Sequence, residues 1–233
     1  MPSTRIPLLA LLCLAACQAL SAADLRLPVL FSDHMVLQRD KPVAVWGWAD
    51  ADEEVSVEFA GQKKAAKADA SGKWSLRLDP LTASAVSRKL TATGKDGRKA
   101  EVSDVLVGDV WLGSGQSNMA MTVNRAKDFE KEKTAASHPL IRHFKEESGA
   151  ATAAQAQAKG NWLACTPDNV GGFSAVLYFF GREIHQEVGV PVGLINTSVG
   201  GTPIESWVSA ETQSSDTETK SVYDNLLKTY QGF

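Results

Sequence analysis

The sequence predicts an α/β protein in which a parallel sheet flanked by helices follows an antiparallel β-sandwich module. Three observations lead to this fold class. From about residue 25 to residue 104, apolar residues recur at every second position, and turn-forming residues interrupt them. After residue 104, near-continuous apolar runs replace this alternation, as in strands that are buried on both faces. These runs alternate with stretches of helical periodicity, which is the order expected of a parallel sheet with crossover helices.

The first 23 residues are predicted to be an export signal rather than part of the fold. They contain one charged residue, Arg5, then an apolar run and small residues before Asp24. The run is shorter than the roughly 20 apolar residues that cross a bilayer, so no transmembrane span is predicted. Cleavage after Ala23 is favoured, and the alternative is a lipobox that would leave a lipid anchor on Cys17. Either route predicts a secreted or periplasmic protein.

The rest of the chain has a small net charge and a single cysteine. Without residues 1–23 it carries 23 basic and 27 acidic residues, so its formal charge is −4. This charge creates no field that would favour nucleic acid as a partner. Cys13 and Cys17 fall in the signal, which leaves Cys165 without an intrachain disulfide partner. Cys165 is therefore expected to be a small buried residue rather than a reactive thiol.

The β-sandwich module is predicted over residues 24–104. The apolar faces of two of its strands are formed by Val55, Val57 and Phe59 and by Trp74, Leu76 and Leu78. The segments 69–72 and 95–98 are expected to be hairpin turns in which glycine supplies a positive φ. Short strands separated by such turns are typical of an antiparallel sandwich.

The α/β domain is predicted over residues 105–233. Its expected strands are VLVGDVWLGSG, LIRHFK and VGLINTS. A helical stretch from Asn118 is expected to stop near Pro139, and Asp168 or Asn169 is expected to cap a second helix. This second helix would present an apolar stripe to the sheet, made of Phe173, Val176, Leu177, Phe180, Ile184 and Val188. The segment GNWLACTPDNVGG, which precedes it, is rich in turn formers.

Two glycine-rich loops, GSGQSNM and SVGGTPIESW, each follow a predicted strand. Because loops at the carboxyl ends of parallel strands line one crevice, we expect the two loops to meet. A serine at a strand-to-helix turn exposes its hydroxyl, and a backbone N–H of the second loop can approach the same point. Such an arrangement would combine a nucleophile, Ser117, with an oxyanion hole.

Two better-known motifs do not fit the first loop. A dinucleotide-binding fingerprint would need a third glycine where Asn118 stands, and an acidic residue about 20 positions further on. A hydrolase elbow of the form G-x-S-x-G would need a glycine at Met119. On motif form alone, a serine that caps a helix is the alternative to a nucleophile.

Three blocks of the sequence resemble one family of enzymes. GDVWLGSGQSNMAM is similar to the nucleophile block of the SGNH hydrolases, and specifically of the sialate O-acetylesterase family. LPVLFSDHMVLQRDKPVAVWGWA resembles the amino-terminal β module of that family, and FSAVLYFFGREI with VPVGLINTSVGGTPIESW resembles its second block. The resemblance runs from about Leu25 to Trp207. It implies a secreted carbohydrate esterase that removes O-acetyl groups from sialic acid or related sugars and needs neither a metal nor another cofactor.

The resemblance also implies roles for individual residues. Ser117 would be the nucleophile and would donate its backbone N–H to the oxyanion. Gly201 would be the next donor, with Gly200 as the near alternative. Asn118 and Trp207 are predicted to contact the acetylated sugar or glycan. Of the tryptophans, most are expected to pack in the core, and Trp207 is the first candidate for stacking on a sugar.

Two segments of the family pattern do not occur in this sequence. They are a Q-G-E segment, whose glutamine completes the oxyanion hole, and a D-x-x-H segment, which holds the histidine base and its aspartate. The chain is therefore expected to be the amino-terminal portion of such an enzyme, with a hydrolase domain incomplete at its carboxyl end. An unpaired sheet edge and an uncovered apolar face would make it poorly soluble and, alone, nearly inactive.

No histidine of the chain is expected to replace the missing base, because none has an aspartate at the family's spacing. These histidines are His34, His138, His143 and His185. Asp104 and Asp109 precede Ser117 and are expected to end a strand or to cap a turn. Two other functions stay open on these grounds. One is a carbohydrate-binding module without catalysis, and the other is an inactive gene fragment.

Overall fold

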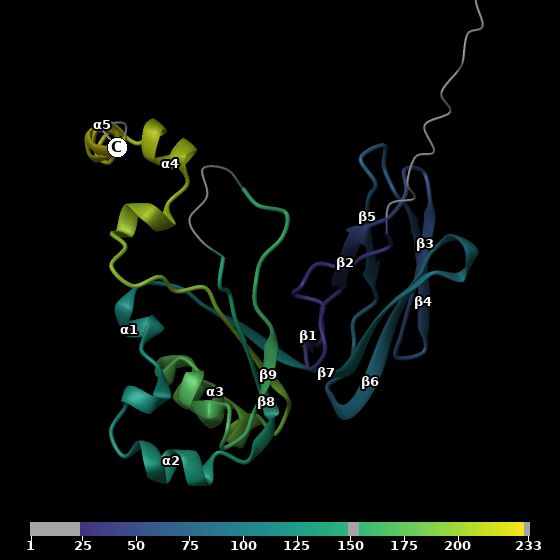
Figure 1. The fold of residues 1–233 in the computed structure, drawn as a ribbon, viewed down its shortest axis with the longest axis horizontal. Helices are drawn as coiled ribbons and strands as arrows, with labels where there is room; N and C mark the ends of the chain where they lie inside the picture. The colour runs from purple at the N-terminus through teal and green to yellow at the C-terminus, as the bar shows by residue number, and fades with distance from the viewer. Residues whose placement is uncertain (1–23, 149–153, 231–233) are drawn as a thin grey trace, which may run out of the picture.

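The computed structural model describes residues 24–148 and 154–230 (Figure 1). The predicted signal, with the cleavage site after Ala23 and the alternative lipobox at Cys17, lies outside the described residues. The chain combines a sheet with parallel strands flanked by helices and an antiparallel part, so the predicted fold class is confirmed. Within the two described ranges, no helix is both long enough and apolar enough to cross a bilayer.

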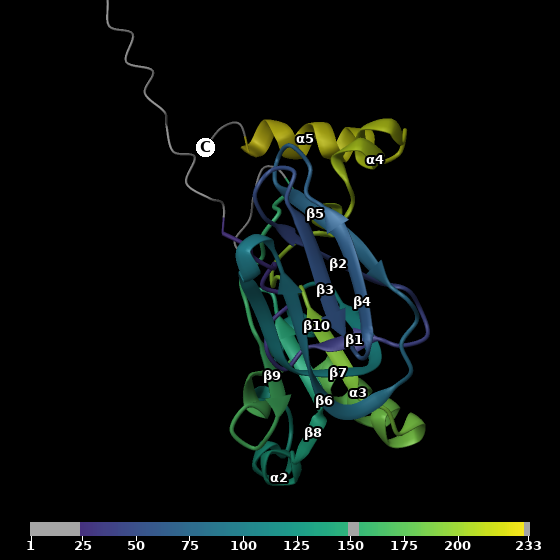
Figure 2. The ribbon, with the colours of Figure 1, turned by 90° about the vertical axis from the view of Figure 1, so that its right-hand side faces the viewer.

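The β module contains the strands that precede β7. They are β1 (Val36–Gln38), β2 (Val43–Trp48), β3 (Glu54–Phe59), β4 (Gln62–Lys67), β5 (Lys73–Leu78) and β6 (Ser84–Thr93). β2 and β5 form a two-stranded antiparallel sheet, whereas β3, β4 and β6 belong to a larger sheet that continues into β7 (Figure 2). The core between them contains Val45, Val57 and Leu90, all fully buried.

Of the two predicted hairpin turns, one is confirmed and one is wrong. The turn at 95–98 joins β6 to its antiparallel neighbour β7, as predicted. The turn at 69–72 instead connects β4 to β5, which lie in different sheets. The hairpin of this region is formed at Ala60 and Gly61, between the paired strands β3 and β4, and both residues have positive φ. A positive φ at a non-glycine residue such as Ala60 is not predictable from its side chain.

The long strand β7 (Lys99–Gly113) connects the β module to the α/β part (Figure 1). Its first half pairs with β6 in antiparallel and with β1 in parallel orientation. Its second half, from Asp109, pairs in parallel with β10 (Val192–Asn196). The predicted boundary between residues 104 and 105 falls inside this strand and stays a prediction.

The α/β part has the strand order β7-β10-β8-β9. β10 lies between β7 and β8 (His138–Lys145) and is parallel to both. β9 (Trp162–Cys165) pairs antiparallel to β8 and falls in the segment that was expected to hold turns. Sequence reasoning missed this strand of four residues because glycine, proline and aspartate residues around it favour turns. Cys165, at the end of β9, is buried as predicted, and burial raises the pKa of its thiol to about 11.

The helices of the α/β part differ from their predicted limits. They are α1 (Ser117–Ala120), α2 (Phe129–Ala135), α3 (Ala175–Val188), α4 (Ala210–Ser215) and α5 (Lys220–Tyr230). The helical stretch from Asn118 is broken into α1, a 3₁₀ turn at residues 123–125 and α2, and Pro139 lies in β8. α3 is capped by Ser174, whose hydroxyl accepts from the Leu177 N–H at 3.3 Å, so the expected caps Asp168 and Asn169 are wrong.

The face that α3 buries also differs from the predicted stripe. Leu177 is buried as predicted, but Val176, Phe180 and Val188 are exposed, and Tyr178 is buried instead. The cause is a close approach at Gly181, where a built Cβ would lie 2.8 Å from a methyl carbon of Leu194 in β10. Because only glycine leaves room for this contact, the helix turns that side to the sheet.

Apolar side chains remain exposed on both faces of the second half of β7. Trp111 is 43% exposed and Leu112 is 67% exposed. The Trp111 ring contacts the Phe180 ring edge-on, with 5.0 Å between the centroids. Beyond Gly108, no described strand pairs with β7 on the side away from β10. In the part of the chain that the structure describes, the second half of β7 therefore has one unpaired edge with exposed apolar side chains beside it.

Candidate active site

The two glycine-rich loops meet, as their places in the sequence predicted. They follow β7 and β10, which are neighbours in the sheet. The Thr197 N–H donates to the Gly113 carbonyl, and the Val199 N–H donates to the Gly115 carbonyl, both at 2.9 Å. A Cβ built on Gly200 would lie 3.8 Å from the Cα of Ser117. The second loop therefore runs directly beside Ser117.

Ser117 is exposed and is the first residue of α1. Its hydroxyl donates to Oε1 of Gln116 at 2.9 Å, and its backbone N–H approaches the same oxygen at 3.4 Å. The N–H contact is long, so this N–H is only weakly engaged. Sequence reasoning missed Gln116, although its place next to the serine was the available signal. A ligand oxygen that displaced Gln116 would find both the hydroxyl and the N–H.

Positive φ angles shape both loops at glycine positions. Gly115 has a φ of 134° and Gly201 a φ of 81°, which only glycine adopts without strain. The Thr202 hydroxyl donates to the Val199 carbonyl at 2.8 Å and closes the second loop into a tight turn. Gly200, at the middle of this turn, is the loop residue placed against Ser117.

The two predicted substrate contacts lie on the rim of these loops. Asn118 follows Ser117 in α1 and is exposed. Trp207 ends the 3₁₀ turn with which the second loop closes and is 37% exposed. Its indole N–H donates to the Thr202 hydroxyl at 3.0 Å, so the ring is tied to the loop that borders Ser117.

Within residues 24–148 and 154–230, no histidine is bonded to Ser117. His143 is buried, stacks on Phe173 with 4.5 Å between centroids, and accepts from the Ser174 N–H. Burial, together with the positive charge of Lys145, lowers the pKa of His143 to about 3, so this ring is neutral at physiological pH. His185 is only partly exposed and bonds through Nδ1 to the Val190 carbonyl at 2.7 Å. His138 begins β8 opposite Cys165.

His34 and Asp104 form a hydrogen bond that the sequence analysis did not anticipate. Nδ1 of His34 lies 2.7 Å from Oδ2 of Asp104, and Arg142 donates to the same oxygen at 2.6 Å. Asp104 was expected to end a strand or cap a turn, which is wrong, because it lies inside β7 and links β7 to β8. Burial alone would raise its pKa, but hydrogen bonds from Arg142, His34 and Ser87 lower it to about 2.

Asp109 was also expected at a strand end or turn, which is wrong, because it too lies within β7. Its carboxylate is bound by an arginine. Both of its carboxylate oxygens accept from Arg39, at 2.9 and 3.0 Å. Neither aspartate is therefore placed to orient a histidine beside Ser117. The described residues also contain no group of three or more histidine, cysteine, aspartate or glutamate side chains arranged to hold a metal ion.

Loss of the Asp104 charge is expected to destabilise the protein in acid. A carboxyl whose pKa is lowered in the folded state stabilises it above its ordinary pKa of about 4, and this contribution is lost as the pH falls towards 2. Asp104→Asn should cost roughly 2 kcal/mol at pH 5, because it leaves the buried Arg142 without its counter-ion. Thermal unfolding is followed by tryptophan fluorescence, and its midpoint temperatures at pH 5 and pH 3 measure both effects.

The matched control for this prediction is Asp52→Asn, since Asp52 forms an ion pair with Lys67 on the exposed surface. It should leave both midpoints nearly unchanged. An Asp104→Asn protein whose midpoint falls between pH 5 and pH 3 as steeply as that of the unaltered protein would contradict the prediction.

The chain is similar to a carbohydrate acetylesterase from Xanthomonas citri of known crystal structure, with 40% sequence identity and a TM-score of 0.78. The similarity covers 82% of this chain and 44% of that one. Over this part, the chain therefore has the fold of a carbohydrate acetylesterase.

A family model described as carbohydrate esterase, sialic acid-specific acetylesterase, matches residues 107–232. The chain belongs to this sialic acid-specific acetylesterase family, as its sequence blocks had implied. Sialate O-acetylesterases of Rattus norvegicus and Homo sapiens are each 34% identical to it, over 88% and 76% of this chain. The chain spans about two fifths of the length of these curated relatives, 41% and 38% respectively.

Proposed function

We propose that this chain carries the nucleophile and part of the oxyanion hole of an exported esterase that removes acetyl groups from sialic acid or a related acetylated sugar. The observation that carries the proposal is the contact between the two loops, which sets Gly200 beside the exposed Ser117. Family membership supports acetyl ester hydrolysis as the reaction, and the sequence of residues 1–23 supports export.

In the proposed reaction, Oγ of Ser117 attacks the carbonyl carbon of the acetyl ester while a base accepts the hydroxyl proton. The negative charge that develops on the carbonyl oxygen is held by the N–H of Ser117 and by that of Gly201 or Gly200. The C–O bond to the sugar then breaks, and the sugar oxygen receives the proton from the base. Water, activated by the same base, hydrolyses the acetyl-serine and releases acetate.

The base in this proposal is none of the described histidines. His34 is bonded to Asp104, and His143 is buried and neutral. His138 lies in β8 opposite Cys165, and His185 bonds to the Val190 carbonyl. A general base must reach the proton that it removes, and none of these rings is bonded to Ser117. The proposal therefore assigns the base and its aspartate to a D-x-x-H segment, which does not occur in this sequence.

The exposed apolar side chains beside the unpaired edge of β7 are consistent with this assignment. Trp111, Leu112 and Phe180 lie next to the open side of the strand that leads to Ser117. Exposed apolar surface next to an unpaired strand is the usual place for another part of a protein to pack. A segment that covered it would come close to the serine loop and could bring the base with it.

A chimera tests this function. Residues 24–232 would be joined to the segment of the Xanthomonas citri acetylesterase that follows its matched region. The chimera is expected to release acetate from an O-acetylated sugar and from p-nitrophenyl acetate, whereas residues 24–233 alone should stay near background because they lack the base. Acetate release is measured with a coupled enzyme assay.

Two outcomes would contradict the proposal. A chimera that binds acetylated glycan without releasing acetate would make the chain a binding module. Hydrolysis by residues 24–233 alone, at rates that vanish on Ser117→Ala, would show that the base lies within this chain.

A further inference from the structure

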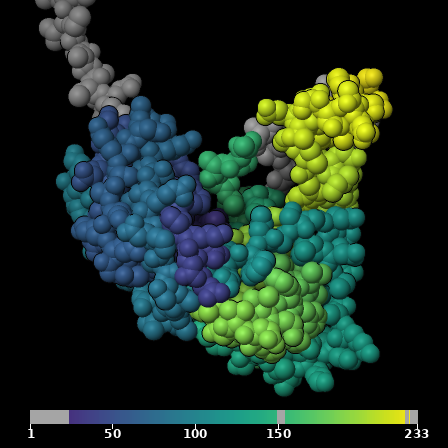
Figure 3. Space-filling model, turned by 180° about the vertical axis from the view of Figure 1, so that it is seen from behind, coloured from purple at the N-terminus to yellow at the C-terminus, as the bar shows by residue number. Residues whose placement is uncertain are grey.

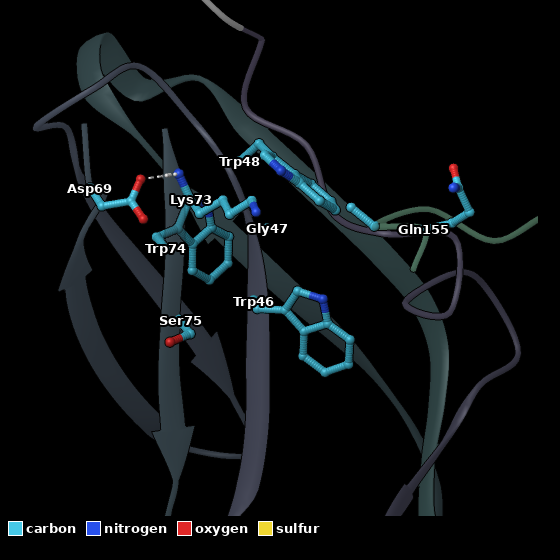
Figure 4. Close-up of a pocket in the computed structure, with 9 residues that line it drawn as sticks. Trp46, Gly47, Trp48, Asp69, Lys73, Trp74, Ser75 and Gln155 are labelled. Atoms are coloured by element: carbon cyan, nitrogen blue, oxygen red, sulfur yellow. Dashed lines mark hydrogen bonds between the residues drawn. The ribbon is translucent and has the colours of Figure 1, made fainter. Parts of the chain in front are cut away.

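A cavity lies on the β module, apart from the serine loops, and three tryptophans line it (Figure 4). It is formed by β2, β5 and loop residues 155–156, and its volume is about 520 Å³. This volume is within the range of pockets that bind small organic molecules. The proposed reaction at Ser117 uses none of the residues that line it.

Trp46 and Trp48 form the aromatic side of this cavity. They flank Gly47 along β2, so both indoles lie on the same face of the strand, and their Cα atoms are about 7 Å apart. Both are only partly buried. Trp74 faces the opposite way, is 2% exposed, and packs under Gly47, where a built Cβ would lie 2.7 Å from its ring. Trp74 therefore belongs to the core, whereas Trp46 and Trp48 present ring surface to the cavity.

Two cations flank Trp48 across the sheet. Lys73 of β5 is its cross-strand partner on one side, and Arg26 pairs with it on the other. The Arg26 guanidinium lies 4.7 Å from the centroid of the Trp48 ring. Within the described residues, neither Arg26 nor Lys73 forms an ion pair with a carboxylate. The cations on either side of Trp48 are thus available to pair with an anionic ligand.

The polar groups of the cavity can bind hydroxyls. Oδ1 of Asp69 is occupied by the Ser71 N–H and hydroxyl, both at 2.7 Å, and by the Lys73 N–H at 3.0 Å. Its other oxygen, Oδ2, can accept a ligand hydroxyl. The exposed Ser75, which is paired with Trp46 on the same face, can donate or accept.

We propose that these residues, named the tryptophan site and consisting of Arg26, Trp46, Trp48, Asp69 and Lys73, bind a sugar ring that bears a carboxylate. The flat indole surface would pack against the C–H face of the ring, and Lys73 and Arg26 would pair with the carboxylate. Asp69 would accept a ring hydroxyl. The inference rests on the proposed function for its glycan ligand, and it adds a subsite that holds an acidic glycan without taking part in the chemistry.

The test compares two glycans that carry no acetyl ester, sialyllactose and lactose, on the whole chain with Ser117→Ala. Calorimetric titration should show that sialyllactose binds at least about tenfold more tightly than lactose, with a preference that weakens as salt is added. Trp48→Ala should weaken sialyllactose binding by about tenfold, and Trp48→Phe should weaken it less. Lys73→Gln should reduce binding of sialyllactose and leave that of lactose unchanged.

Lys41→Gln is the matched control, because this exposed lysine precedes the other end of β2. Equal affinity for the two glycans, or full affinity for sialyllactose after Lys73→Gln, would overturn the inference that the ligand is acidic. Full affinity after Trp48→Ala would overturn the site itself. Circular dichroism verifies that each variant is folded. No ester is hydrolysed in this titration, so its result does not depend on whether the chimera releases acetate. If the chimera releases acetate but the chain does not bind sialyllactose, this inference alone is overturned.

Discussion

Replacing Ser117 by alanine in the active chimera is expected to lower acetate release by at least about 10³-fold. The substitution removes the only atom that would form the acetyl-enzyme, while Gly200 and the remaining loop contacts stay in place. The Michaelis constant for the acetylated sugar should change little, since the serine hydroxyl contributes to bond formation more than to substrate binding. Initial rates of acetate release over a range of substrate concentrations measure both quantities.

The matched control is Ser114→Ala, since Ser114 is an exposed serine in the same loop. This variant should retain most of the activity of the unaltered chimera. If both variants lose activity equally, the loop needs serine for its conformation. The result would then contradict the assignment of Ser117 as the nucleophile.

Replacing Gly108 by alanine is expected to destabilise the fold by about 3 kcal/mol. Gly108 lies in β7 where the strand leaves β1 and begins to pair with β10. A Cβ at this position would overlap the Pro191 carbonyl oxygen and lie 2.6 Å from the carbonyl carbon. The same oxygen accepts from the Asp109 N–H at 2.9 Å, so it cannot move away without loss of that bond. Urea unfolding of the chimera, followed by tryptophan fluorescence, measures the loss.

Gly172→Ala serves as the control, because nothing lies within 4 Å of a Cβ built there. Its free energy of unfolding should stay within about 0.5 kcal/mol of that of the unaltered protein. If Gly108→Ala unfolds at the same urea concentration as Gly172→Ala, the close contact between β7 and Pro191 is not a constraint on the fold.

Local patterns in the sequence predicted the elements that lie in its regular parts. Period-two alternation marked β3 and β5, and a continuous apolar run marked β7. The glycine loops after β7 and β10 were predicted to meet because parallel strands end at one edge, and the structure joins them through Gly113 and Gly115. These predictions needed no information beyond neighbouring residues and one rule of sheet topology.

The errors arise where a distant contact decides the local structure. The buried side of α3 is set by the close approach of Gly181 to Leu194. Hydrophobic periodicity does not predict this contact, because glycine has no side chain. The partners His34 and Asp104 are 70 positions apart in the sequence, so no local pattern joins them. For the site, the resemblance to the esterase family indicated Ser117 and the glycines, because motif form alone did not separate a nucleophile from a capping serine. The engagement of Gln116 with the serine hydroxyl depended on side-chain geometry.

The central claim, that Ser117 is the nucleophile, is tested most directly by mapping a covalent adduct. The active chimera would be treated with a fluorophosphonate, digested, and analysed by mass spectrometry. We expect the phosphonyl group on Ser117 alone, with loss of acetate release in proportion to labelling, and no adduct in the Ser117→Ala variant. Inactivation of the chimera with the adduct on another residue, and an unmodified Ser117, would contradict the account.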